Sequence, residues 1–189
     1  MSATKGLEGV VAAESTISSI IDDQLTYVGY TIDDLAENAS FEEVIFLLWK
    51  KRLPNKQELQ ELKQNLFEHM ALPNEIIEHF KSYDIHSVHP MAALRTAVSF
   101  LGLVDPEADD MSEEANERKA IRLQARVSSV VAAFSRIRDG KEVIKPKEGL
   151  GYAANFLYML NGKEPEDLEV EAINKSLVLH ADHELNAST

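Results

Sequence analysis

The chain has 189 residues, a net charge of −13 and no cysteine. Hydrophobic residues make up 44% and charged residues 27%, a composition typical of a soluble globular protein and not of a disordered one. The acidic balance argues against a nucleic-acid partner, and the lack of cysteine excludes disulfides, thiolate metal ligands and a thiol nucleophile.

The N-terminal segment carries neither the basic and apolar regions of a signal peptide nor the arginines of a transit peptide. No apolar run approaches the ~20 residues of a membrane span. We therefore expect a cytoplasmic protein with no membrane partner. Residues 17–21 and 25–28 are mostly apolar or β-branched and flank Asp22-Asp23, which predicts one short hairpin and little other sheet.

The next residues have helical patterns. Ser40-Phe-Glu-Glu43 is a capping box, and residues 41–49 are apolar almost all round, which predicts a buried helix with Trp49 as a core anchor. A ligand platform at Trp49 is the less favoured alternative. Asn55 caps a second helix, whose apolar stripe has helical spacing and consists of Leu59, Leu62, Leu66 and Met70.

A loose H-x-x-H pair, His86 and His89, precedes the following helix. That helix begins at His89-Pro90-Met91, where the missing N–H of Pro90 costs nothing. A zinc site would need further ligands, and the sequence offers no obvious third one nearby. We therefore expect no metal site here.

One long helix is predicted over residues 116–138, after an acidic connector, residues 105–117, that we expect to be a solvated loop. Two faces of this helix have side chains suited to packing against other helices. One carries Leu123, Val127, Val130, Phe134 and Ile137, and the other, mostly small, carries Ile121, Ala125, Ser128 and Ala132. We expect the first face to meet the core of its own subunit and the small face to lie in a dimer interface.

A third face of this helix is basic. Arg118, Arg122 and Arg126 lie at i, i+4 and i+8. They form either an anion site or, as we favour, ion pairs with local acids such as Glu114.

The chain reaches its most polar cluster after two more predicted helices, over residues 152–160 and from Pro165 onward. The cluster is His180-Ala-Asp-His183-Glu184, in which the histidines share one face at helical spacing. It has three interpretations. A metal site lacks an evident fourth ligand. In a structural role, His180 bonds to a backbone carbonyl while Asp182 and Glu184 cap a further helix. In a substrate site, a histidine N–H oriented by a carboxylate donates to an anion.

Several segments, in order, resemble those of citrate synthases. The terminal cluster is similar to the family's first histidine motif, and residues 25–35 resemble its Y-x-G-Y-x-I-x-D-L stretch. Further matches are Gly6-Leu-Glu-Gly-Val10, Phe41-Glu-Glu-Val, His89-Pro-Met91 and Asn155-Phe-Leu-Tyr-Met-Leu160. The resemblance covers essentially the whole chain and corresponds to the N-terminal half of the family's length.

This resemblance implies an all-α, multi-helical fold with at most one short N-terminal hairpin, in which residues 1–189 form an incomplete large domain. It implies an acyltransferase that condenses acetyl-CoA with oxaloacetate to citrate and CoA at the entry to the tricarboxylic acid cycle. The enzyme would be a homodimer with acetyl-CoA as co-substrate and no bound cofactor. The contact with oxaloacetate falls on His183, with His180 as a supporting residue.

The family's later histidines, its catalytic aspartate and its clamping arginines have no counterpart in this sequence. We therefore assign no catalytic residue and expect residues 1–189 alone to be inactive. Two alternatives stay open. One is 2-methylcitrate synthase, which uses propionyl-CoA, and the other is a non-catalytic half-length protein that binds a full-length paralogue.

Overall fold

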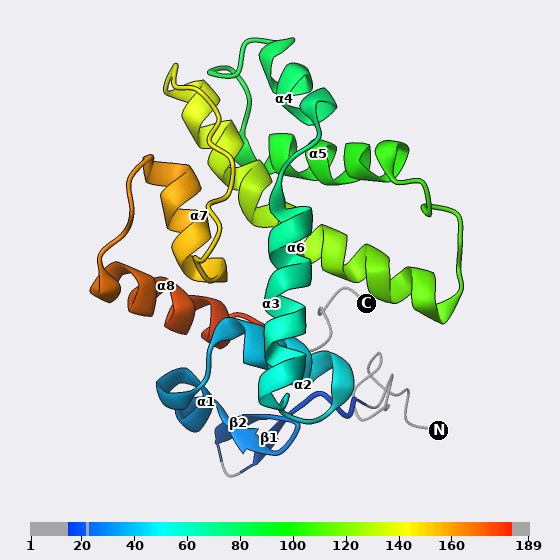
Figure 1. Ribbon diagram of the computed structural model, residues 1–189, viewed down its shortest axis with the longest axis vertical. Helices are drawn as coiled ribbons and strands as arrows, with labels where there is room; N and C mark the ends of the chain where they lie inside the picture. The colour runs from blue at the N-terminus through cyan, green and yellow to red at the C-terminus, as the bar shows by residue number, and fades with distance from the viewer. Residues whose placement is uncertain (1–14, 22, 183–189) are drawn as a thin grey trace, which may run out of the picture.

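The computed structural model describes residues 15–21 and 23–182, and within them it has eight helices and one three-stranded sheet (Figure 1). This confirms the predicted helical fold. The strands are β1 (Ser18–Ile21), β2 (Gln24–Tyr27) and β3 (Tyr30–Thr31). The helices are α1 (Ile32–Asn38), α2 (Phe41–Lys50), α3 (Lys56–Met70), α4 (Asn74–Lys81), α5 (Pro90–Val104), α6 (Glu113–Arg138), α7 (Tyr152–Asn161) and α8 (Asp167–Leu179). None of these described helices is long and apolar enough to cross a membrane.

The sheet is antiparallel in the order β1-β2-β3. The predicted hairpin is formed by β1 and β2, with Ser18 opposite Tyr27. The structure adds β3 through a tight turn at Val28 and Gly29, whose φ angles of 51° and 86° are both positive, as a type I′ hairpin turn requires. Helix α1, which was not predicted, begins directly after the sheet with Thr31 as its N-cap.

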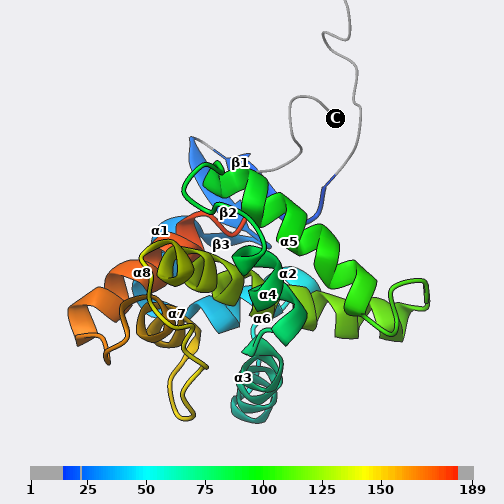
Figure 2. The ribbon, with the colours of Figure 1, turned by 90° about the horizontal axis from the view of Figure 1, so that it is seen from above.

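The longest helix, α6, lies at the centre of the molecule and packs against α3, α4, α5 and α7. Figure 2 shows α3 and α5 on opposite sides of it. Two separate clusters of buried side chains result. The first is shared by α1, α2, α3, α7, α8, β2 and one side of α6, and the second by α4, α5 and the C-terminal part of α6.

The predicted small face of α6 is buried inside this chain, so its assignment to a dimer interface was wrong. Ala125 and Ala132 belong to the first cluster, where their small side chains allow neighbouring helices to approach closely. Next to them, the Ser129 hydroxyl donates to the Met70 carbonyl at the end of α3, at 2.6 Å. Conversely, Leu123 and Val131 are 41% and 38% exposed. The exposed apolar surface of α6 therefore lies elsewhere on the helix than expected.

A buried acid on α2 caps α7. Glu42 is only 4% exposed, and its Oε1 accepts a hydrogen bond from the Tyr152 backbone N–H at 3.0 Å. The N-cap residue of α7 is Gly151, which has no side chain to do this. A Cβ at Gly151 would lie 3.3 Å from Glu42 Oε1, so glycine leaves room for the carboxylate. The negative charge also faces the positive end of the α7 dipole.

The loop before α7 is held by Asn155, which is 1% exposed. Its Oδ1 accepts from the Lys147 backbone N–H at 2.8 Å, and its Nδ2 donates to the carbonyls of Lys147 and Leu150, both at 3.0 Å. A buried amide that uses both of its donors and its acceptor fixes one loop conformation. Together with the Glu42 cap, it sets where α7 begins.

We predict that Glu42→Ala lowers the free energy of unfolding by about 2 kcal/mol, because it leaves a buried N–H without an acceptor. Glu42→Gln keeps an acceptor oxygen and should lose less. The measurement is urea unfolding followed by circular dichroism, with the exposed Glu37→Ala on α1 as the control. Equal unfolding midpoints for Glu42→Ala and Glu37→Ala would show that the cap does not matter.

Candidate functional site

The C-terminal end of α8 carries the described part of the histidine cluster. The helix begins with a reciprocal cap between Glu166 and Glu169 and ends at Leu179, with His180 as its C-cap. Val178 is fully buried, whereas Leu179 and His180 are exposed. The buried side chain of Val178 thus anchors the end of α8 in the core, and His180, two residues later, lies at the surface.

The ring of His180 bonds to the last turn of its own helix. Its Nδ1 lies 2.7 Å from the Ser176 carbonyl oxygen. Because a carbonyl can only accept, Nδ1 carries a proton and donates it to the Ser176 carbonyl. The contact fits the structural interpretation of His180 and leaves a contact with substrate untested. The other predicted contact residue, His183, and its neighbour Glu184 lie outside the described residues.

Asp182, the residue before His183, is held by the N-terminal sheet. The Tyr27 hydroxyl donates to the Asp182 carbonyl at 3.0 Å and accepts from the Asp182 N–H, with an N···O distance of 3.3 Å. The Ser18 hydroxyl donates to Asp182 Oδ2 at 2.5 Å. In Figure 2 the red end of α8 runs up to the sheet. The first strands and the last described residues thus form one site, although 155 positions separate Tyr27 from Asp182.

Tyr27 is 0% exposed, and its burial is the main cause that raises its pKa. The negative charge of Asp182 acts in the same direction, and the hydrogen bond to the Asp182 backbone opposes them. The hydroxyl therefore keeps its proton at neutral pH and can donate it to the carbonyl. Sequence reasoning missed Tyr27, because strand alternation marks it as inward-facing but does not identify its distant partner.

Asn174, in the middle of α8, joins this helix to the turn between α1 and α2. Its Oδ1 accepts from the Phe41 N–H at 2.8 Å, and its Nδ2 donates to the Ala39 carbonyl at 3.1 Å. Phe41 is the first residue of α2, so Asn174 supplies one of the acceptors that a helix start requires. α8 is thus fixed near its middle by Asn174 and just beyond its end by the sheet.

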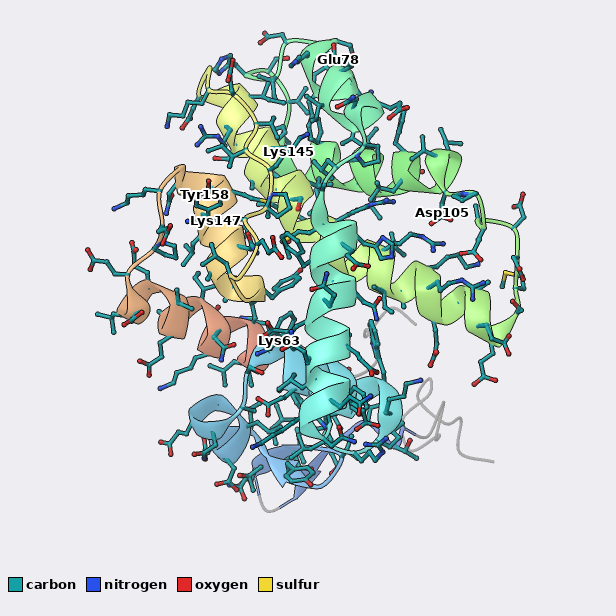
Figure 3. The ribbon with its side chains drawn as sticks, in the orientation of Figure 1. Lys63, Glu78, Asp105, Lys145, Lys147 and Tyr158 are labelled. Carbon is teal, nitrogen blue, oxygen red and sulfur yellow. The ribbon has the colours of Figure 1, made fainter. Side chains whose placement is uncertain are left out.

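The predicted basic face of α6 is largely neutralised by ion pairs. Arg122 binds Asp105 through two hydrogen bonds, Nε–Oδ2 at 2.7 Å and Nη2–Oδ1 at 2.8 Å, and it also contacts Glu107. Arg118 pairs with the same Glu107. The prediction of ion pairs is confirmed for these two arginines, but the acids come from the connector before the helix instead of from Glu114. Figure 3 labels Asp105 at the end of α5.

The acidic connector is accordingly more ordered than predicted. Ser112 accepts from the Ala115 N–H, so α6 begins at Glu113 and its first turn absorbs acids assigned to the loop. Asp105 and Glu107 face the helix and not the solvent. The expectation of a solvated loop over residues 105–117 holds for most of these residues, which are exposed, but not for Asp105 and Glu107, which pair with Arg122.

Arg126 differs from the other two arginines. Its Nε is buried without a hydrogen-bond partner among the described residues, and burial lowers its pKa, as does the charge of Arg122, while Asp105 opposes both. A cavity of about 140 Å³ is lined by Lys119, Arg122 and Arg126, by the acid Asp105 and by apolar residues. The anion-site interpretation stays a prediction for Arg126.

Of two other candidate sites, the structure changes the interpretation of Trp49 and agrees with the expected place of His89 at a helix start. Trp49 is 39% exposed and lines a groove of about 470 Å³ with Phe46 and Ile121, so its assignment as a core anchor was wrong. His89 accepts from the Met91 N–H as the N-cap of α5. In the described ranges, no three or more His, Asp or Glu side chains are arranged to hold a metal ion.

Similarity to known proteins points to one family. The family model described as "Citrate synthase, C-terminal domain" matches residues 6–189. Citrate synthase 2 of Bacillus subtilis (strain 168) is 70% identical over 189 residues, which are 100% of this chain and 51% of that protein. The 2-methylcitrate synthase of Mycobacterium tuberculosis (strain ATCC 25618 / H37Rv) is 41% identical over 187 residues, 98% of this chain and 47% of that protein.

Solved structures that resemble this chain are also citrate synthases. The citrate synthase of Pyrobaculum aerophilum matches with a TM-score of 0.88 and 36% identity, over 97% of this chain and 48% of that chain. The citrate synthase of Thermoplasma acidophilum, solved as a ternary complex with carboxymethyl coenzyme A and oxaloacetate, matches with a TM-score of 0.88 and 25% identity, over 99% of this chain and 49% of that chain. The chain thus spans about half the length of the relatives it matches.

The Asp105–Arg122 pair generates a pH-dependent prediction. Burial raises the pKa of Asp105, but the hydrogen bonds from Arg122 and the Glu107 N–H outweigh it, so the pKa lies below its ordinary value of 3.8. A depressed pKa stabilises the fold above the ordinary value, and this contribution is lost as the pH falls through the folded-state pKa. Asp105→Asn should cost about 3 kcal/mol at pH 7, and the difference from wild type should shrink below pH ~4.

Urea unfolding at pH 7, 5 and 3.5 measures this difference. Asp139→Asn, which breaks an exposed pair with Lys141, is the matched control and should stay close to wild type at neutral pH. A constant difference between wild type and Asp105→Asn over this pH range would contradict the prediction.

Proposed function

The chain belongs to the citrate synthase family, and from this premise we propose that it is the N-terminal part of an enzyme that condenses acetyl-CoA with oxaloacetate to citrate and CoA. This reaction is the entry to the tricarboxylic acid cycle. The observation that carries the proposal is the family match, which extends over residues 6–189 and so includes the whole histidine cluster. Because the chain spans about half of its relatives' length, the activity is proposed for a family-length protein, and residues 1–189 alone are expected to be inactive.

In this proposal His183 donates an N–H to oxaloacetate and so holds its ketone in the orientation in which it is attacked. The enol of acetyl-CoA attacks the ketone carbon, and hydrolysis of the resulting citryl-CoA gives citrate and CoA. His180 has a supporting role, because the Ser176 carbonyl fixes the orientation of its ring. We place the proton-removing carboxylate and the arginines that bind the substrate carboxylates in the rest of a family-length chain.

We predict that the native-length protein releases CoA from acetyl-CoA only when oxaloacetate is present, and that His183→Gln lowers kcat/KM at least about 100-fold. A thiol reagent follows CoA release, and mass spectrometry identifies citrate. The control is His86→Gln, because His86 is an exposed histidine on a loop. Activity of His183→Gln equal to that of His86→Gln would refute the assigned role, and an inactive wild-type protein would refute the synthase function.

Two alternatives are separated by related measurements. The match to a 2-methylcitrate synthase favours a test with propionyl-CoA, in which a higher kcat/KM than with acetyl-CoA would change the assigned product. An intact mass of 21.1 kDa from the native source, together with co-purification of a full-length synthase, would favour the non-catalytic interaction protein.

We also propose a homodimer in the cytoplasm, with α6 and α5 at or near the interface. Supporting this, the apolar side chains Met91 and Leu103 on α5 and Leu123 and Val131 on α6 are exposed. Leu123 and Val131 are eight residues apart and therefore lie on one face of α6. A second copy of the chain would remove this apolar face from water.

Leu123→Asp should convert the native-length dimer into a monomer or weaken its dissociation constant at least about tenfold, because it buries a charge in an apolar interface. Analytical ultracentrifugation over a dilution series measures this. The control is Leu168→Asp, since Leu168 is exposed on α8, which packs against α1, α2 and α7. If both variants dissociate equally, the interface lies elsewhere.

A further inference from the structure

We propose that Tyr27 and Ser18 are positioning residues for oxaloacetate, because their hydroxyls hold Asp182 and so orient the peptide unit that leads into His183. The inference rests on the proposed function, in which His183 contacts oxaloacetate. It assigns to the N-terminal sheet a role in substrate binding that its distance along the chain from the histidine cluster does not suggest.

The Tyr27 hydroxyl holds the backbone on both sides of Asp182. It accepts from the Asp182 N–H, at an N···O distance of 3.3 Å, and donates to the Asp182 carbonyl at 3.0 Å. The first group belongs to the peptide unit that precedes Asp182. The second belongs to the planar unit that also contains the backbone nitrogen of His183. These two contacts hold the backbone on both sides of the Asp182 Cα, which is the basis for proposing that they orient the residue that follows.

Ser18 adds a hold on the side chain of the same residue. Its hydroxyl donates to Asp182 Oδ2 at 2.5 Å, a short distance typical of a charge-assisted hydrogen bond. Ser18 and Tyr27 are directly opposite each other on β1 and β2, and such cross-strand partners project their side chains to the same face of a sheet. The sheet thus presents two hydroxyls side by side to one residue.

The two parts of the Tyr27 side chain serve different purposes. The ring belongs to the first hydrophobic cluster, where a phenylalanine ring would fill the same volume. The hydroxyl has the Asp182 N–H and carbonyl as its hydrogen-bond partners. Removing the oxygen alone therefore tests positioning while leaving the packing of the ring in place.

The experiment uses Tyr27→Phe in the native-length protein. The expected result is a Kd for oxaloacetate, measured by isothermal titration calorimetry, that rises about tenfold, because a misdirected His183 binds the anion less well. KM for oxaloacetate should rise in parallel, whereas KM for acetyl-CoA should stay within about twofold. Tyr30→Phe is the matched control, because Tyr30 is 43% exposed on the neighbouring strand.

Ser18→Ala should raise the Kd by a smaller factor, and hydrogen exchange of the peptide that contains Asp182 and His183 should be faster in Tyr27→Phe than in Tyr30→Phe. Equal oxaloacetate affinities for these two tyrosine variants would overturn the inference. So would a rise in both KM values together with a lower Tm, which indicates a purely structural role. Failure of the proposed function is recognised separately, because the wild-type protein would then neither bind oxaloacetate nor form citrate.

Discussion

The structure depends on the burial of α6 on two opposite sides. A helix in the middle of two cores needs side chains that are small where neighbours approach and large where space must be filled. Ala125 and Ala132 are buried in the first cluster, and Val130 and Phe134 fill the second. Dense apolar packing on both sides fixes most of the helix, and the hydrogen bond from the Ser129 hydroxyl to the Met70 carbonyl adds a polar contact to it. The other helices take their positions from it, including α7, on which α8 packs.

Polar contacts then determine the details of the position of α8 that apolar packing does not determine. Packing holds α8 against α1, α2 and α7, but packing alone does not set where a helix stops or where the chain goes next. Asn174 fixes the middle of α8 against the α1–α2 turn, and Tyr27 fixes the residues after its end. Because buried or half-buried polar groups must be satisfied, each contact has few alternatives. The site is therefore precise even though it joins two distant segments.

How much of the fold and the site could be predicted depends on whether a sequence pattern is local or involves residues far apart in the chain. Capping patterns and apolar periodicity are local, and they correctly located the hairpin, α2, α3, α5, α7 and most of α6. Contacts between distant segments are not local. Neither the Glu42 cap of α7 nor the Tyr27–Asp182 contact can be recognised from a short stretch of sequence, because each joins residues more than 100 positions apart. The small face of α6 shows the same limit. The sequence indicated that something approaches Ala125 and Ala132, but a neighbouring helix of the same chain and one of a second subunit predict the same small residues.

The charge distribution of residues 1–189 bears on the proposed binding of oxaloacetate, a dianion. The chain carries 32 acidic and only 19 basic side chains. On α6, Arg118 forms an ion pair with Glu107, and Arg122 forms ion pairs with Asp105 and Glu107. A histidine N–H can orient oxaloacetate, but two carboxylates also need cationic partners to offset their loss of water. The proposed synthase function would therefore need cationic groups beyond Arg118 and Arg122, because both of these are already paired with acids of the same chain.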